Sequence, residues 1–457
     1  MDRLGAARAA FGEWLKGVSL HTPARLVVGV FALVILLFAG LLSLPAATAS
    51  GQRAPFIDAL FVATSAVCVT GLTPVDTGTY WSPLGLAIIA AAMKVGGLGI
   101  MTLASLVGLA ISRRLGLTQR LLAAGEARAS GLGDLRTMLR LIITVSVTVE
   151  AVVAVILFPR LLTLDYGWAR SAGYSAFYAI SAFNNAGFSP DPAGLGPFEH
   201  DAWMLVPLGV GVLVGSLGFP VYLVLLRSWR RPRTWTLHAK LTLLMTVVLT
   251  TVATAMLALF EWENDATLGR ASTVQTLGSA LFHSVNQRSG GFSAFGVGQA
   301  TQETWLLEDV MMFIGGGSGS TAGGIRMTTL AVLLLAVWAE ARGRRDMEAF
   351  GKRIGTVVLR QAVGVLLASL FIVIVGTAVF MWQTGIGLDR ALYEVISAFA
   401  TCGLSTGITA DIGTDAKVTL ILMMYLGRIG SLTIAGALAL NQQRRVIRYP
   451  AERPIIG

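Results

Sequence analysis

Charged residues are scarce in this chain of 457 residues: 13% are Asp, Glu, Lys or Arg, against about 25% in a typical soluble domain. Hydrophobic residues make up 54%. So little charge cannot cover a water-facing surface, which argues against a soluble enzyme and against a disordered protein. The length would allow two or three soluble domains, but the composition favours a single polytopic membrane domain.

Cysteine and histidine are also rare. The two cysteines, Cys68 and Cys402, are too few for a disulfide framework. The four histidines show no spacing typical of metal ligands, and no nucleophile constellation is visible. We therefore expect that the chain is not an enzyme.

Long apolar runs indicate how often the chain crosses a membrane, since one span needs about 20 apolar residues. Lysine and arginine then orient the spans: 25 of them fall on one face and six on the other. The basic face is predicted to be cytoplasmic, with both termini inside, so the net charge of +10 is a topology signal and does not indicate nucleic-acid binding. The eight predicted spans are Leu26–Leu44, Leu84–Ile111, Leu141–Phe158, Ala202–Leu226, Leu241–Phe260, Val310–Trp338, Ala362–Trp382 and Val418–Leu440.

The spans form four pairs, and each pair is separated by a long outer stretch with a short apolar run. Such a run cannot span but suits a re-entrant helix, and non-helical backbone at that depth must be buried or line a water-filled cavity. We predict an all-α integral membrane fold of four pseudo-symmetric helix–re-entrant loop–helix repeats around one central pore. The predicted parts are a cytoplasmic N-terminal segment (1–24), repeat 1 (25–111), a loop (112–140), repeat 2 (141–226), a loop (227–240), repeat 3 (241–338), a loop (339–361), repeat 4 (362–440) and a cytoplasmic tail (441–457).

The four re-entrant segments resemble one another. Three of them contain Ser-Ala followed by four further residues and a glycine; the glycine is followed first by Leu or Phe and then by Ser or Thr. The third copy has lost Ser-Ala but keeps Gly291-Phe292-Ser293. The key glycines Gly71, Gly187, Gly291 and Gly403 are 116, 104 and 112 residues apart. Self-similarity at a nearly fixed period indicates a repeat architecture.

A glycine at the turning point suits an ion filter. Potassium-type filters replace the hydration shell of the ion with backbone carbonyl oxygens, and glycine reaches the required positive φ without steric cost. The C-terminal end of each short helix would favour a cation. The predicted filter residues are Val69, Thr70, Gly71, Leu72, Asn185, Ala186, Gly187, Phe188, Ser289, Gly290, Gly291, Phe292, Thr401, Cys402, Gly403 and Leu404.

The sixth span has six glycines in ten residues. Each costs a helix about 1 kcal/mol relative to alanine, so we expect a broken helix with a loop at membrane depth. A close-packing face of small residues is the alternative; a nucleotide-binding loop is disfavoured because no Gly-Lys-Ser/Thr follows. Arg428 in the last span would face the interior or water, unless it snorkels or forms a structural ion pair. The residues of this expected loop and the intramembrane cation are Gly315, Gly316, Gly317, Ser318, Gly319, Ser320, Thr321, Ala322, Gly323, Gly324 and Arg428.

This fourfold pattern, with Thr-Gly-Leu, Ala-Gly-Phe, Gly-Gly-Phe and Cys-Gly-Leu, resembles the Trk/Ktr/HKT superfamily of potassium transporters over nearly the whole chain. Eight spans favour its Ktr branch. The resemblance implies a bacterial plasma-membrane protein that conducts potassium, with Gly71 implying selectivity because a serine there goes with sodium permeation. It also implies a gate formed by the glycine-rich loop and Arg428, a homodimer, and a cytoplasmic RCK-type nucleotide-binding regulatory subunit. It implies no organic cofactor, and leaves open whether sodium activates or is transported.

Four further charges leave alternatives open. Lys94 could contact the gate or a dimer interface, or be structural. Arg288 is expected to brace the filter from behind, with Glu394 as a candidate partner. Glu150 could couple transport to protons, so an alternating-access symporter driven by sodium or protons is the second hypothesis. All four repeats run in the same direction, which disfavours it, because such transporters usually contain inverted repeats.

Overall fold

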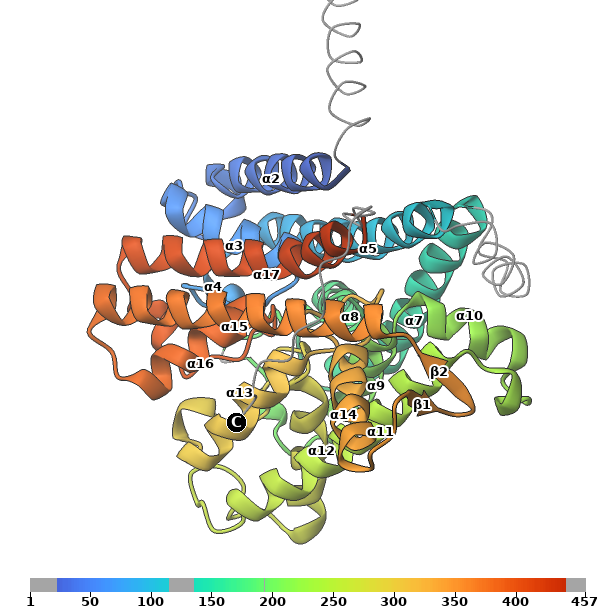
Figure 1. Cartoon of the computed structure of the whole chain (residues 1–457). Coiled ribbons are helices and arrows are strands. Elements are labelled where there is room, and N and C mark those ends of the chain that lie inside the picture. The colour runs from blue at the N-terminus through green and yellow to red at the C-terminus, as the bar shows by residue number, and fades with distance from the viewer. Residues whose placement is uncertain (1–22, 115–134, 193, 441–457) are drawn as a thin grey trace, which may run out of the picture.

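The structure, a computed structural model, describes residues 23–114, 135–192 and 194–440 (Figure 1). The predicted N-terminal segment and C-terminal tail, and most of the predicted loop 112–140, lie outside these residues.

The described chain is almost entirely helical, as predicted for the fold class. Its helices are α2 (Pro23–Leu42), α3 (Phe56–Cys68), α4 (Thr77–Tyr80), α5 (Pro83–Arg114), α7 (Leu135–Leu162), α8 (Trp168–Asn184), α9 (Ala202–Leu217), α10 (Phe219–Ser228), α11 (Leu237–Phe260), α12 (Thr273–Asn286), α13 (Gln302–Ile314), α14 (Met327–Ala341), α15 (Thr356–Thr384), α16 (Leu388–Phe399) and α17 (Thr414–Leu440). Short 3-10 turns are η1 (Pro45–Ala47), η2 (Gly196–Phe198), η3 (Pro232–Thr234), η4 (Val297–Gln299) and η5 (Ile408–Ala410).

The helices form four repeats of the same kind. Each has a long first helix (α2, α7, α11, α15), a short pore helix (α3, α8, α12, α16) and a second helix (α5, α9 with α10, α13 with α14, α17). The second helix of each repeat contacts the pore helix of the next: α5 packs on α8, α9 on α12, and α13 on α16. Helix α17 then packs on α3, so the fourth repeat closes the ring against the first (Figure 1). The predicted pseudo-fourfold arrangement is therefore confirmed.

Three helices are long and apolar enough to cross a membrane by themselves: α7 from Leu139, α11 and α15. Shorter apolar helical stretches occur in α2, α3, α5 and α14. Large apolar side chains point outward, among them Val155, Leu259 and Phe371. Many exposed large apolar side chains on long apolar helices are typical of a membrane-facing exterior.

The fourth predicted span, Ala202–Leu226, is not one continuous helix. It breaks at Gly218, and α9 and α10 meet at 99°. Gly218 has φ +90°, which a glycine tolerates, and Pro220 in the first turn of α10 suits a new helix start. A Cβ on Gly218 would lie 2.7 Å from the Ser318 carbonyl oxygen. The glycine-rich loop that begins at Gly315 thus occupies the space beside the bend.

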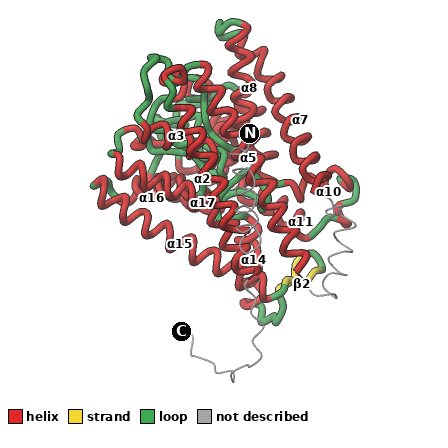
Figure 2. The backbone as a smooth tube through the Cα atoms, turned by 90° about the horizontal axis from the view of Figure 1, so that it is seen from above, coloured by secondary structure: helices red, strands yellow, loops and turns green. Residues whose placement is uncertain are grey.

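A small hairpin lies in the last basic loop. Strands β1 (Met347–Ala349) and β2 (Lys352–Ile354) pair antiparallel, with Met347 opposite Ile354. Figure 2 shows the hairpin beside α14, at the edge of the helical body. The sequence analysis gave no expectation of strands in this loop.

Candidate functional site

The four predicted filter segments, here called the pore loops (69–72, 185–188, 289–292 and 401–404), share one backbone conformation. In each, a non-glycine residue with positive φ lies two positions before a glycine with positive φ. In an extended strand, successive carbonyl groups point to opposite sides. A positive φ at every second residue reverses the direction of that residue's carbonyl, so that successive carbonyls can face the same side. The third loop, whose sequence is degenerate, has the same pattern. The pairs are Val69 and Gly71, Asn185 and Gly187, Ser289 and Gly291, and Thr401 and Gly403.

The glycines of the pore loops lie against one another's carbonyl groups. A Cβ on Gly71 would lie 2.4 Å from the carbonyl oxygen of Ala186. A Cβ on Gly403 would lie 2.0 Å from the carbonyl oxygen of Thr70. The first loop therefore meets the second on one side and the fourth on the other.

The remaining contacts complete the ring. A Cβ on Gly187 would lie 2.7 Å from the Gly291 Cα, and one on Gly291 would lie 2.4 Å from the Cys402 carbonyl oxygen. Segments more than 300 residues apart in the chain thus converge in the order first, second, third, fourth and back to the first. Small residues are required here because backbone packs directly on backbone.

The Ser-Ala motif has a structural explanation. The Ser65 hydroxyl accepts a hydrogen bond from the Gly71 amide at 3.0 Å, and the Ser397 hydroxyl accepts one from the Gly403 amide at 3.1 Å. In the third repeat, the amides of Gly290 and Gly291 are instead held by the carbonyl oxygen of Asn286. In repeats 1 and 4 the serine therefore fixes the turn from pore helix to pore loop, whereas the buried Ser181 hydroxyl of repeat 2 has no hydrogen-bond partner among the described residues.

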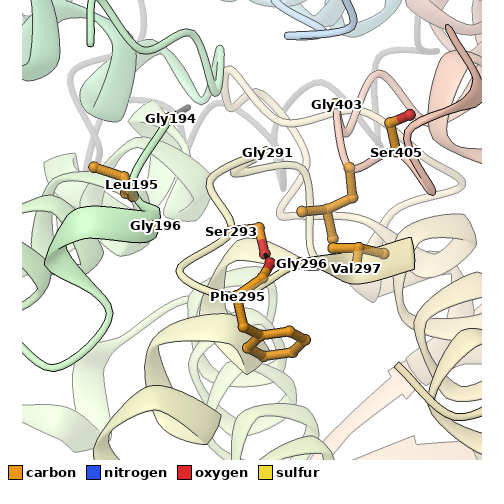
Figure 3. Close-up of a pocket in the computed structure, with 11 residues that line it drawn as sticks. Gly194, Leu195, Gly196, Gly291, Ser293, Phe295, Gly296, Val297, Gly403 and Ser405 are labelled. Carbon is orange, nitrogen blue, oxygen red and sulfur yellow. Dashed lines mark hydrogen bonds between the residues drawn. The ribbon is translucent and has the colours of Figure 1, made fainter. Parts of the chain in front are cut away.

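A cavity of about 250 Å³ opens next to the pore loops. Figure 3 shows three groups of residues around it, one from each of repeats 2, 3 and 4. All of them lie at or after the pore-loop glycines in the chain. The lining residues are Gly194, Leu195, Gly196, Gly291, Ser293, Phe295, Gly296, Val297, Gly403, Leu404 and Ser405.

The glycine-rich loop 315–324 contacts the pore loops at residues before their glycines, whereas the cavity is lined by residues at or after the glycines. Helix α13 ends before it and α14 begins after it, so the sixth span is interrupted as the sequence predicts. The Ser289 hydroxyl accepts from the Gly323 amide at 2.9 Å and donates to the Thr401 carbonyl at 2.7 Å. The Thr321 hydroxyl lies 3.1 Å from the Asn185 side-chain oxygen. The loop therefore lies directly against three pore loops, two of them through side-chain hydrogen bonds.

Two arginines, the buried Arg428 and the half-buried Arg326, hold this loop. The Arg428 guanidinium donates to the Thr321 carbonyl at 2.5 Å and is 1% exposed, and its Nε and Nη2 have no partner among the described residues. Arg326 donates to the carbonyls of Ala322 and Gly317. The sequence analysis did not select Arg326, although a cation at the end of a glycine-rich run within an apolar span was a detectable signal.

Lys94 and Glu150 neutralise each other. The Lys94 ammonium lies 2.6 Å from the Glu150 carboxylate and 2.6 Å from the Ser146 hydroxyl. The Asn184 amide donates to the same carboxylate at 3.1 Å. The pair thus links α5 to α7 and to the end of the second pore helix.

The predicted pairing of Arg288 with Glu394 is wrong. Arg288 is buried and donates to the Thr250 hydroxyl and, at 3.4 Å, to the Thr246 carbonyl, both on α11. Glu394 accepts hydrogen bonds from the chain that follows the fourth pore loop. The two residues lie in neighbouring repeats, and each makes its hydrogen bonds within its own repeat.

The family of cation transport proteins named TrkH matches residues 20–447 of this chain. The chain belongs to the TrkH family. It is 36% identical over 436 residues to the Ktr system potassium uptake protein B of Bacillus subtilis, covering 95% of this chain and 97% of that protein. It is 31% identical to the potassium/sodium uptake protein NtpJ of Enterococcus hirae, in an alignment that covers 95% of this chain and 97% of that protein. These relatives are transport proteins and not enzymes.

The crystal structure of the potassium transporter TrkH from Vibrio parahaemolyticus has the same fold. It superposes with a TM-score of 0.67 over 88% of this chain and 83% of that one, at 19% sequence identity. The predicted membership in this family of membrane cation transporters is therefore confirmed.

Proposed function

We propose that this protein takes up potassium across the bacterial plasma membrane by gated, channel-like conduction through the ring of pore loops. The observation that carries the proposal is the closed ring, in which carbonyl oxygens of Thr70, Ala186 and Cys402 face neighbouring glycines. Relatives at 36% and 31% identity are named as uptake proteins for potassium and for potassium and sodium. Their names support the choice of ion.

The ring suits a partly dehydrated cation. Carbonyl oxygens replace the hydration shell of potassium in filters of this kind. Four pore helices end at the ring, and the partial negative charge at each helix C-terminus attracts a cation. The cavity beside the ring is the entrance from outside. No acidic side chain has to bind the ion itself.

The gate in this proposal is the glycine-rich loop with its two arginines. The loop closes the inner side of the ring, and Arg326 and Arg428 hold it through their hydrogen bonds to loop carbonyls. The buried charge of Arg428 and the half-buried charge of Arg326 also repel an approaching cation, since the protein interior screens charge weakly. Opening requires the loop to move away from the pore loops and the arginines to follow.

Regulation is proposed to come from outside the chain. Both termini are placed in the cytoplasm, two copies form a homodimer, and an RCK-type nucleotide-binding subunit of the KtrA kind docks on the basic inner loops, including Arg342–Arg360. Co-purification with a soluble nucleotide-binding subunit, and its loss when the basic residues of 342–360 are neutralised, would test the docking.

The function is tested by growth and ion uptake in a bacterium that lacks its potassium-uptake systems. The native chain should restore growth at low external potassium and import potassium in preference to sodium. A Gly71→Ser variant should still import cations but admit sodium more readily, because the added side chain displaces the Ala186 carbonyl oxygen. Absence of potassium uptake by the native chain together with its regulatory partner would refute the proposal.

A further inference from the structure

The four repeats differ at one position of the pore helix, nine residues before the pore-loop glycine. Repeats 1 and 3 have the apolar residues Val62 and Phe282 there. Repeats 2 and 4 have the polar residues Tyr178 and Glu394. All four side chains are buried, so the difference lies behind the pore loops and not on the surface.

In repeat 4, the Glu394 carboxylate holds the chain that leaves the pore loop. One carboxylate oxygen accepts from the Ser405 hydroxyl at 2.6 Å and from the Thr406 amide at 2.9 Å. The other accepts from the Thr409 hydroxyl at 2.9 Å. The side chain is 0% exposed. Donors from three residues thus meet one buried carboxyl group, so this segment is tightly positioned.

This contact between a polar side chain of the pore helix and the chain after the pore loop is here called the brace. Repeat 2 has the same brace, with the hydroxyl and the carboxylate exchanged between the two segments. Here the pore helix supplies the hydroxyl: Tyr178 donates to the Asp191 carboxylate at 2.6 Å and lies 2.8 Å from the Ser189 hydroxyl. Asp191 follows the pore loop and accepts a second hydrogen bond from Tyr166 at 2.7 Å. Ser189 and Ser405 are equivalent, each two residues after the glycine.

Repeats 1 and 3 lack this brace. The equivalent hydroxyls, Thr73 and Ser293, donate to carbonyls two residues further along their own segments, those of Val75 and Phe295. Figure 3 shows the second of these bonds at the edge of the cavity. The pore helices of these repeats therefore have only apolar contact at this position.

Because the ring runs through the repeats in chain order, the two braced segments lie diagonally across it. We propose that the buried carboxylates Asp191 and Glu394 are positioning residues for ion selectivity: they fix two opposite segments at the outer mouth of the proposed filter. Selectivity between ions of different size requires coordinating oxygens that are held in place. Ser405 lines the cavity, so the Glu394 charge lies one hydroxyl group behind the entrance. This inference rests on the proposed potassium conduction.

The test compares two isosteric variants with controls on the same helices. Glu394→Gln removes the charge and one acceptor oxygen; Asp389→Asn removes a charge from the exposed start of α16. Tyr178→Phe removes the hydroxyl that reaches Asp191, whereas Tyr174→Phe removes a hydroxyl that contacts Arg170 instead. Initial rates of potassium and sodium uptake are measured in cells, with the amount of each variant in the membrane determined by immunoblot.

Glu394→Gln and Tyr178→Phe should each lower the ratio of potassium to sodium uptake about tenfold, equivalent to about 1.4 kcal/mol, and both controls should keep the native ratio. An unchanged ratio in both test variants, or an equal fall in the controls, would overturn the inference while the proposed function stands. If Glu394→Gln does not reach the membrane, Tyr178→Phe and Ser405→Ala decide by the same criterion. If the native chain imports no potassium, the proposed function fails and this inference with it.

Discussion

A single methyl group at Gly403 should disrupt the proposed filter. Gly403 has φ +99°, and an alanine Cβ there would lie 2.0 Å from the Thr70 carbonyl oxygen, whereas ordinary contacts begin at 3.4 Å. The carbonyl must therefore retreat by about 1.4 Å, the difference between those two distances. Loss of one interaction with a charged group is worth about 1.5–3 kcal/mol, which corresponds to a roughly 10- to 150-fold loss in potassium conduction.

Gly385 provides a matched control for this change. It has φ +69°, but a Cβ there meets nothing within 4 Å. Both alanine variants therefore carry a similar backbone strain of about 1–3 kcal/mol, and only Gly403→Ala moves a pore-loop carbonyl. The assay is potassium uptake by proteoliposomes containing equal amounts of each variant. Native uptake and native ion preference in Gly403→Ala would refute the reasoning, as would equal losses in both variants.

Three further predictions concern the parts around the ring. Lys94→Met should lower the free energy of unfolding by about 3 kcal/mol because it leaves the Glu150 carboxylate unpaired. A fluorescence melting curve in detergent should show this loss of stability. The double variant Lys94→Met/Glu150→Gln should recover most of the lost stability. Gly218→Ala should be destabilised by about 1–3 kcal/mol through its positive φ and should raise basal flux by displacing the glycine-rich loop; unaltered melting and flux would contradict this. Arg428→Ala, and separately deletion of residues 315–324, should raise potassium flux or abolish its regulation, and native flux in both would exclude the barrier.

The repeat architecture was predictable because its physical requirement is local. Glycine adopts positive φ without steric cost, and in repeats 1 and 4 the serine of Ser-Ala-x4-Gly supplies the hydroxyl that holds the glycine amide. Even the third repeat, which lacks the serine, keeps the glycine and the same backbone pattern. The interruption of the sixth span was also predictable, because six glycines in ten residues cannot form a stable helix.

What the sequence could not reveal depends on contacts between distant segments. The bend at Gly218 is coupled to Ser318, one hundred residues later, and a single Gly-x-Pro within an apolar run is a weak local signal. Charge pairing predicts Arg288 as the partner of Glu394, but the partners in the structure include the neutral hydroxyl groups of Ser405 and Thr409. The position of Arg326 at the end of the glycine-rich run marks it as a candidate from the sequence, but the loop carbonyls that it contacts become visible only in three dimensions.

The most direct test of the ring as an ion pathway is an experimental structure determined with rubidium in place of potassium, with anomalous scattering used to locate the ion. A peak is expected inside the ring, within coordination distance of the carbonyl oxygens of Thr70, Ala186 and Cys402. A fully loaded crystal with rubidium bound elsewhere, and none among those oxygens, would contradict the proposed pathway.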